Sequence, residues 1–469
     1  TPGRSEMVCD SSRSFLPERI SLSEFAESDV RSPATNVVDC SLDWSQVAAS
    51  REVHSGRMDL QEATQQQPVE WCHRRLLSRI HRLTMDGLRR QIEPVSVDVF
   101  MRFLFRRHGI IESDRREGSN GLFEVVGLLQ GLDIPSVAWE RDILPLRVTG
   151  YQSEWLDELC LTGEVGWMRL FPPIRSPDKS RPMASLTRVA PVSLFLREDL
   201  PWLAAGAPDP DYEGLSSPAG QLLEILTSRG AMFGTDLQME TQMLHDHLDD
   251  ALGELVSRGQ ITADGFSGLR TLIAEKRPTS RRSHRSRSER IRVTRAAIGR
   301  WSVARPPTRE DDSEDSREGN NRPPNNVSTE WAWQLLRRWG IVFRDLLASE
   351  TGAPAWFELL QVFRRLEARG EIRGGRFITG VGGEQFALAD TVQKLRQLRD
   401  QGPQREFVVI TAADPVNLVG VLTKHERVPR TASNRVVYLD GVPIAALRGV
   451  REESLGTVSE EHLASALHR

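Results

Sequence analysis

Apolar residues recur every three to four positions along the stretch from Trp71 to Arg107, which is the spacing of one face of a helix. The pattern predicts a first helix that ends before Pro94 and a second helix, capped by Ser96, from about Val97 to Arg107. We expect the first helix to pack into a core along this face. Its apolar positions are Leu76, Leu77, Ile80, Leu83, Leu88 and Ile92.

The first helix also carries a basic stripe, interrupted by Asp86. A row of guanidinium groups suits phosphate, because each group can bind two oxygens and its charge displaces counterions. The stripe therefore predicts DNA binding, and a solvated arginine-rich face is the equally good alternative. Its members are Arg75, Arg79, Arg82, Arg89 and Arg90.

The clearest domain prediction falls on residues 328–400. A helix that ends at Gly340, a second that begins at Phe343, and a long amphipathic helix from Trp356 to Arg369 are followed at 370–388 by a strand, a glycine-rich turn and a second strand. Three helices and a hairpin in this order predict a winged helix. Arg373 and Arg376 flank the tip of the hairpin, where we expect them to contact the DNA backbone.

The other segments complete an α+β fold class of tandem winged-helix or helix-turn-helix domains followed by a small antiparallel β-barrel. Residues 1–67 are predicted to be a degenerate winged helix, with an irregular cap as the alternative. Residues 68–275 are predicted to be helical and mixed α/β. Residues 217–270 have a helix-turn-helix layout that lacks a clear wing, with an ordinary three-helix packing unit as the equally good alternative. Residues 401–469 alternate apolar residues around turns such as Asp440–Gly441, which predicts the barrel.

Charge and composition narrow the function classes. The formal net charge is −4 over 469 residues, so a nucleic-acid surface has to be a local patch. Residues 276–327 place an arginine-rich block before an acidic block and are predicted to be a disordered charged linker. The basic block either follows a nucleic-acid backbone or pairs with the acidic block.

Several chemistries find no support in the sequence. No apolar run reaches transmembrane length, and none of the four cysteines forms a CxxC pair, so we expect a cytoplasmic protein with free thiols and no membrane contact. His245 and His247 lie on different faces of a helix, and neither a metal nor a cofactor is predicted. No GxxxxGK[ST] loop and no DEAD box are present, which excludes ATP hydrolysis by that route.

Three separated blocks resemble the C-terminal half of the large helicase-related (Lhr) proteins, a bacterial family of DNA repair helicases. They are WCHRRLLSRIHR to EPVS at 71–96, GELVSRGQITADGFSGLRTLI at 253–273, and GRFITGVGGEQFAL with ADPVNLVG at 375–420. With the spacing between them, the likeness covers most of residues 70–450. The family's final segment, beyond the position of Arg469, has no counterpart, and we expect the chain to be a fragment.

The resemblance has several implications. In this family the C-terminal region is similar to the AlkZ-type DNA glycosylases, which string winged helices onto a β-barrel. Some members are assigned uracil-DNA glycosylase activity, and the isolated region forms oligomers, here expected to be a tetramer. The implied partners are single-stranded or duplex DNA, further copies of the chain, and the N-terminal helicase core of the same polypeptide.

Base excision requires an extruded base, a pocket that holds it, and a carboxylate that orients water or stabilises the sugar cation. Gln385 follows the glycines of the predicted wing, and Asp414 and Asn417 lie in the turn sequence ADPVN. We take these three as the candidate catalytic residues. The structural alternatives are a glutamine that fills a corner of the wing and an aspartate before proline that bonds its own backbone.

The leading hypothesis is therefore a DNA-binding module of an Lhr-type helicase, with uracil excision as its candidate chemistry. The alternative is a non-catalytic module that oligomerises the helicase and clamps DNA. In that case the exposed tryptophans would line a subunit interface; the candidates are Trp331, Trp333, Trp339 and Trp356. A transcription regulator of the helix-turn-helix type is the third possibility, and the predicted barrel argues against it.

Overall fold

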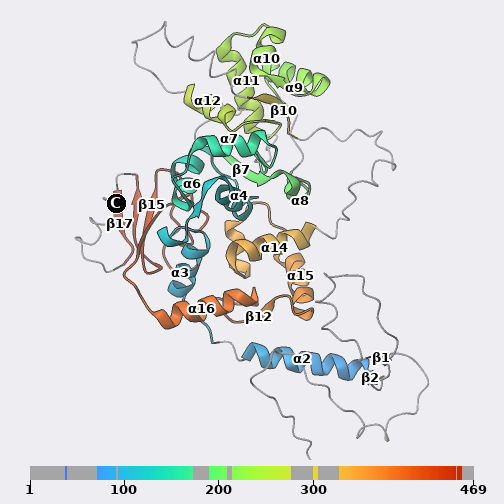
Figure 1. Cartoon of the computed structure of the whole chain (residues 1–469), viewed down its shortest axis with the longest axis vertical. Coiled ribbons are helices and arrows are strands. Elements are labelled where there is room, and N and C mark those ends of the chain that lie inside the picture. The colour runs from blue at the N-terminus through green and yellow to red at the C-terminus, as the bar shows by residue number, and fades with distance from the viewer. Residues whose placement is uncertain are drawn as a thin grey trace, which may run out of the picture. The chain divides into compact units, whose positions relative to one another are not determined.

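The computed structural model describes eight stretches of the chain, which divide into two compact units (Figure 1). The first unit is Thr1–Gln91 and the second is Ile92–Arg469. The described stretches are 37–39, 71–90, 93–172, 190–208, 214–275, 299–304, 327–449 and 451–456.

The described part of the first unit contains a two-stranded antiparallel sheet and one helix. β1 (Val37–Asp39) pairs with β2 (Trp71–His73), and α2 (Arg74–Arg90) follows directly. The rest of the predicted winged helix at 1–67 lies outside the described residues. The expected burial of the apolar face of α2 is wrong for three leucines. The exposed leucines are Leu76, Leu77 and Leu83.

The second unit begins with α3 (Val97–Arg107), as predicted, and then repeats one topology three times. In each repeat a helix is followed by a short strand, further helical segments and two more strands. The third strand always lies between the first and the second in the sheet. In the second repeat, α12 also lies between the last two strands. A helix-turn-helix followed by two antiparallel strands is the winged-helix arrangement, so the predicted winged-helix architecture is confirmed.

The first winged helix occupies a region that the sequence only marked as mixed α/β. Its three-stranded sheet has the order β4-β7-β6. A two-stranded parallel pair, β3 (Arg116–Glu117) with β5 (Val148–Thr149), lies beside it, and η1 (Glu112–Asp114) precedes it. Its elements are α4 (Gly118–Leu129), β4 (Ile134–Pro135), α5 (Ser136–Ala138), η2 (Trp139–Ile143), α6 (Leu144–Arg147), α7 (Ser153–Leu161), β6 (Val165–Met168) and β7 (Pro191–Leu196). The chain then turns through η3 (Arg197–Asp199) and α8 (Leu200–Ala204).

The second winged helix corrects the prediction of a helix-turn-helix without a wing. Its missing strand is β10 (Arg300–Val303), which the sequence placed inside the linker. Trp301 on β10 is buried and meets Trp167 of the first winged helix edge-on, with ring centroids 6.3 Å apart. The other elements are α9 (Ser217–Arg229), β8 (Met232–Phe233), α10 (Gly234–Thr241), α11 (His245–Ser257), β9 (Ile261–Ala263) and α12 (Ser267–Glu275).

The third winged helix has the expected order of elements. Its sheet has the strand order β11-β13-β12, and Phe363 stacks on Phe386 in its core, with ring centroids 5.2 Å apart. Its elements are α14 (Val327–Trp339), β11 (Ile341–Val342), η6 (Arg344–Ser349), α15 (Trp356–Ala368), β12 (Arg373–Gly375) and β13 (Gln385–Ala387). α16 (Ala389–Gln401) follows.

The predicted β-barrel is wrong: the described residues form an open antiparallel sheet with the order β14-β15-β16-β17. The chain after β14 does not continue as a strand. Asp414 N donates to Thr411 O and Asn417 N donates to Asp414 O, so consecutive turns take up backbone groups that a further strand would need. The strands are β14 (Phe407–Thr411), β15 (Arg435–Leu439), β16 (Val442–Arg448) and β17 (Arg451–Ser454).

Two large hydrophobic clusters fill the second unit. One joins α3, the third winged helix and one face of the open sheet, and the other joins the first two winged helices. Arg338 links the two parts: its side chain donates to the carbonyls of Leu128 and Gln130 at the end of α4 and pairs with Glu350. Arg338 and Glu350 are both fully buried.

Candidate nucleic-acid interface

α15 is the second helix of a helix-turn-helix pair, the position of a recognition helix. Its apolar face is buried and carries Leu359, Val362, Phe363 and Leu366. The opposite face is exposed and carries Phe357, Gln361, Arg364 and Arg365. The neighbouring hairpin exposes Arg373 and Arg376. The sequence placed both beside the tip, whereas Arg373 pairs with Ala387 at the base of the hairpin and Arg376 directly follows β12.

Ion pairs decide which cations of this face are available to a ligand. Arg364 pairs with Glu384 at 2.7 Å and so ties α15 to the hairpin. Arg369 pairs with Glu371 at 2.6 Å. Arg365, Arg373 and Arg376 make no ion pair with another described residue. We call these three arginines the wing-helix face.

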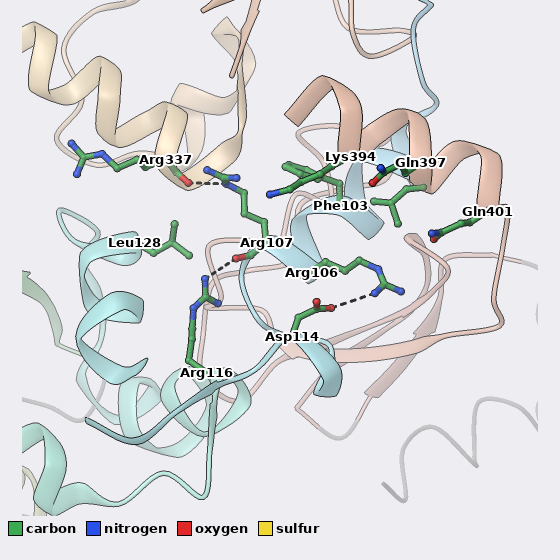
Figure 2. Close-up of a pocket in the computed structure, with 11 residues that line it drawn as sticks. Phe103, Arg106, Arg107, Asp114, Arg116, Leu128, Arg337, Lys394, Gln397 and Gln401 are labelled. Atoms are coloured by element: carbon green, nitrogen blue, oxygen red, sulfur yellow. Dashed lines mark hydrogen bonds and ion pairs between the residues drawn. The ribbon is translucent and has the colours of Figure 1, made fainter. Parts of the chain in front are cut away.

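A second basic feature is a pocket of about 490 Å³ between α3, α4, α14 and α16 (Figure 2). Five basic residues and one acidic residue, Asp114, line it. The basic residues are Arg106, Arg107, Arg116, Arg337 and Lys394. They come from four separate elements, and the sequence singled out none of them.

Two models of the large helicase-related protein, winged-helix domain, match the chain, at residues 95–183 and 321–407. The matches cover much of the first winged helix and all of the third. The chain is also 30% identical over 391 residues to the Lhr helicase/probable uracil glycosylase of Mycolicibacterium smegmatis, an alignment of 79% of this chain and 24% of that protein. It is 29% identical over 406 residues to the Lhr helicase/uracil glycosylase of Escherichia coli, over 77% of this chain and 24% of that protein.

The chain belongs to the large helicase-related family. It spans about a quarter of the length of the curated relatives that it matches. No helix in the part of this Lhr-family chain that the structure describes is long and apolar enough to cross a membrane.

The structure brings two of the predicted catalytic residues together, in a fully buried position. Both carboxylate oxygens of Asp414 accept hydrogen bonds of 2.8 Å from Arg147, and neither side chain is exposed. Asn417 is buried nearby and donates to Ala412 O at 3.1 Å. Asp414 Oδ1 also accepts from Val416 N at 3.0 Å, as the structural alternative for an aspartate before proline requires. These contacts favour a structural role, and catalysis by this pair stays a prediction.

Gln385, the third predicted catalytic residue, lies apart from Asp414, in β13, and holds the hairpin together. Its Oε1 accepts from the backbone N–H groups of Phe377 and Ile378, and its Nε2 donates to the carbonyls of Ile378 and Val381. Every hydrogen-bonding site of a side-chain amide is thus occupied inside the protein. Val95, just before α3, pairs with the same hairpin. A base-reading role for Gln385 stays a prediction, and its contacts favour the structural alternative.

The remaining predicted residues are the arginines of α2 and the four candidate interface tryptophans. On α2, Arg75, Arg79 and Arg82 are exposed and Arg89 is half-buried, whereas the side chain of Arg90 lies outside the described residues. Their DNA contacts stay predictions. The idea that exposed tryptophans line a subunit interface is wrong for Trp331 and Trp339, which are fully buried, and Trp333 and Trp356 are partly buried against the core.

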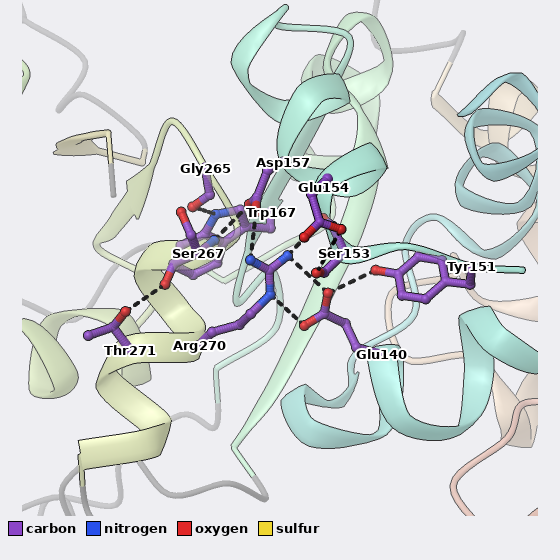
Figure 3. A network of polar contacts seen from close by, with 10 residues as sticks. All are labelled: Glu140, Tyr151, Ser153, Glu154, Asp157, Trp167, Gly265, Ser267, Arg270 and Thr271. Atoms are coloured by element: carbon purple, nitrogen blue, oxygen red, sulfur yellow. Dashed lines mark hydrogen bonds and ion pairs between the residues drawn. The ribbon is translucent and has the colours of Figure 1, made fainter. Parts of the chain in front are cut away.

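Arg270 of α12 joins the second winged helix to the first (Figure 3). It donates to both carboxylate oxygens of Glu140, at 2.6 and 2.9 Å, and to Asp157 at 2.6 Å. Tyr151 also donates to Glu140, at 2.8 Å, and burial together with the Glu140 charge raises the pKa of that phenol. The winged helices are therefore joined by paired charges as well as by apolar contacts.

His108 follows α3 and is fully buried among arginines. Its Nε2 lies 3.0 Å from Arg338 O, so Nε2 carries the proton and donates, and Nδ1 has no hydrogen-bond partner among the described residues. Burial, and then the charge of Arg147, lower the pKa of His108 well below its ordinary value. The imidazole is therefore neutral in the folded chain.

This depressed pKa predicts a loss of stability in mild acid. Below about pH 6.5 the unfolded chain takes up a proton at this histidine and the folded chain does not, so the free energy of unfolding falls by about 1.4 kcal/mol per pH unit. Urea unfolding between pH 7 and pH 5 should show this slope in wild type and a shallower one in His108→Gln. His247→Gln, at an exposed position, is the control and should keep the wild-type slope. Parallel curves for wild type and His108→Gln would contradict the prediction.

Proposed function

We propose that this chain is the nucleic-acid-binding module of a large helicase-related protein and that the wing-helix face contacts the DNA backbone. The observation that carries the proposal is the position of its three arginines. Arg365 lies on the helix in the recognition position, and Arg373 and Arg376 lie on the adjoining hairpin, none of them neutralised by a described carboxylate. Guanidinium groups placed in this way bind phosphate oxygens on either side of a groove.

Replacement of the three arginines by glutamine should weaken DNA binding and flatten its salt dependence. Each lost phosphate contact lowers the slope of log K against log salt by about 0.9 for duplex DNA, so we expect a fall of about 2 to 3 for the triple variant. Fluorescence anisotropy with a labelled duplex at several salt concentrations measures both quantities.

The matched control removes three exposed cations elsewhere on the second unit, in Arg396→Gln, Lys424→Gln and Arg451→Gln. The overall change of charge is the same in both triple variants. The control should therefore keep most of the slope, because its cations do not lie on the wing-helix face. Equal slopes for wild type and the face variant would rule out this face as the DNA contact.

We propose three further roles. The arginines of α2 form a second contact with DNA, because Arg79 and Arg82 are exposed on one helix.

Uracil excision is proposed because both relatives are named as uracil glycosylases, the one from Mycolicibacterium smegmatis as a probable one. Alkali cleavage of uracil-containing DNA after treatment with the wild-type chain tests it.

We also propose that the chain associates with the helicase core of its parent polypeptide and forms a tetramer. Sedimentation of the purified chain tests the tetramer.

A further inference from the structure

The basic pocket lies away from the elements that carry the wing-helix face. Its lining residues come from α3, η1, β3, the end of α4, the end of α14 and the second half of α16 (Figure 2). α15, β12 and β13 contribute none of the lining residues. The pocket therefore calls for an explanation of its own.

The cations in the pocket are unequally neutralised. Arg106 pairs with Asp114 at 3.3 Å and with Glu406 at 3.7 Å, Arg116 with Glu124 at 3.7 Å, and Lys394 with Asp390 at 3.2 Å. Arg107 forms no ion pair with a described residue; it donates to the carbonyls of Leu336 and Arg337. Arg337 faces the pocket with its carbonyl oxygen, and its exposed side chain points away from the other lining residues (Figure 2). Arg107 is thus without a described ion pair, and the exposed pair of Lys394 with Asp390 is screened by water and leaves the ammonium group available to a ligand.

Two of the guanidinium groups beside the pocket are held in a partly buried environment. Burial lowers the pKa of Arg107 and of Arg116; the charges of Asp390 and Glu124 offset this in part, and a neighbouring arginine adds to it in each case. An anion in the pocket would further offset the cost of burying these charges.

The remaining walls are apolar, and the volume exceeds that of a bare ion. Phe103, Leu128 and Leu398 line the pocket together with the amides of Gln397 and Gln401. At about 490 Å³, the pocket falls within the range of small-molecule sites, which is roughly 300–1,000 Å³. A phosphate attached to a nucleoside matches this combination of guanidinium groups, side-chain amides and apolar surface.

We propose that the pocket binds the phosphate monoester of a nucleotide, either at the end of a nucleic-acid strand or in a free nucleoside monophosphate. A monoester carries close to two negative charges and three acceptor oxygens, whereas a backbone diester carries one charge. Several convergent donors therefore favour a terminal phosphate. Asp114 stays paired with Arg106 at the edge of the site and disfavours an anion at that point. Only the strand-end form of the proposal rests on the proposed function.

The experiment compares DNA hairpins that differ only in a terminal phosphate, together with thymidine monophosphate and thymidine. Wild type should bind the phosphorylated end about tenfold tighter than the hydroxyl end, the value of roughly one charge-assisted hydrogen bond. The variant is Lys394→Gln, at an exposed position, so that folding is preserved. It should lose most of the preference and keep its affinity for the hydroxyl end. The matched control is Arg396→Gln; Arg396 is also exposed and lies two residues along α16, outside the pocket.

The results distinguish a strand end from a free nucleotide as the ligand. They also distinguish failure of the pocket proposal from failure of the proposed DNA contact at the wing-helix face. A phosphate-dependent preference for hairpin ends, lost only in the pocket variant, supports the strand-end form. Calorimetric binding of thymidine monophosphate but not thymidine, lost in the same variant, supports the free-nucleotide form even if the chain binds no DNA. If neither ligand shows a phosphate-dependent difference between wild type and the pocket variant, the pocket proposal is overturned, whatever the wing-helix face does.

Discussion

Asp414→Asn is expected to lower the free energy of unfolding by about 3–5 kcal/mol, the usual cost of removing one partner of a buried ion pair. Asp414 and Arg147 are both fully buried, and the carboxylate accepts two bonds of 2.8 Å from one guanidinium. After the substitution, the neutral amide cannot match both donors. The only other acceptor that the described structure gives Arg147 is Ile143 O at 3.2 Å. A buried cation is then left without its counter-charge.

Urea unfolding followed by tryptophan fluorescence measures this loss. Asp390→Asn is the matched control, because it removes one carboxylate from the exposed pair with Lys394, whose side chains are 56% and 57% exposed. A pair screened by water to this degree contributes about 0–1 kcal/mol. If the two variants unfold at the same urea concentration, the buried pair does not stabilise the fold more than an exposed pair does.

The same pair decides how an excision assay can be interpreted. An Asp414→Asn variant that has lost activity is uninformative if it is also partly unfolded. Replacing the pair by apolar residues, Arg147→Met with Asp414→Leu, removes the carboxylate without leaving a buried charge and should recover most of the stability. If this double variant is folded and still excises uracil, Asp414 is not the catalytic acid. If it is folded and inactive beside an active wild type, the catalytic proposal gains its first support.

The features that local patterns determine could be predicted from the sequence. α3 runs from Val97 to Arg107 as expected, although Ser96 at its N-terminus makes no side-chain capping bond. The third winged helix is continuous in sequence apart from short loops, so its helices and hairpin carry their own signals. Asp440 and Gly441 both have positive φ, at 49° and 85°, as a tight hairpin turn demands.

The features that depend on distant partners could not be predicted. β10 pairs with β9, whose last residue is 37 positions before the first residue of β10 in the printed sequence, and nothing local marks Arg300–Val303 as part of that sheet. Arg147 and Asp414 are 267 residues apart. The sequence around Asp414 predicts the turn and gives no information about a partner at that distance. The pocket gathers cations from four elements in the same way. The barrel failed for a different reason: alternating apolar residues predict strands and do not reveal whether a sheet closes.

Gly441→Ala is expected to lower the free energy of unfolding by about 3 kcal/mol or more. A Cβ at Gly441 would lie 2.2 Å from the carbonyl oxygen of Asp98 in the first turn of α3, a backbone atom that cannot rotate away. The φ of 85° adds about 1–2 kcal/mol for any L-residue with a side chain, and overpacking a close contact adds typically 1–3 kcal/mol. Both costs arise at the turn between β15 and β16, which contacts the first turn of α3.

Gly449→Ala separates the two costs. Gly449 also has positive φ, at 64°, but a Cβ there would meet nothing within 4 Å. The free energy of unfolding of this control should therefore fall only by the cost of the positive φ. The difference between the variants in urea unfolding therefore measures how tightly the β15–β16 turn packs on α3. Because Phe103, Arg106 and Arg107 of α3 line the basic pocket, Gly441→Ala should also weaken phosphate-dependent binding, and Gly449→Ala should not. Equal stability of Gly441→Ala and Gly449→Ala would mean that the β15–β16 turn can shift at little cost. The open sheet would then not position α3.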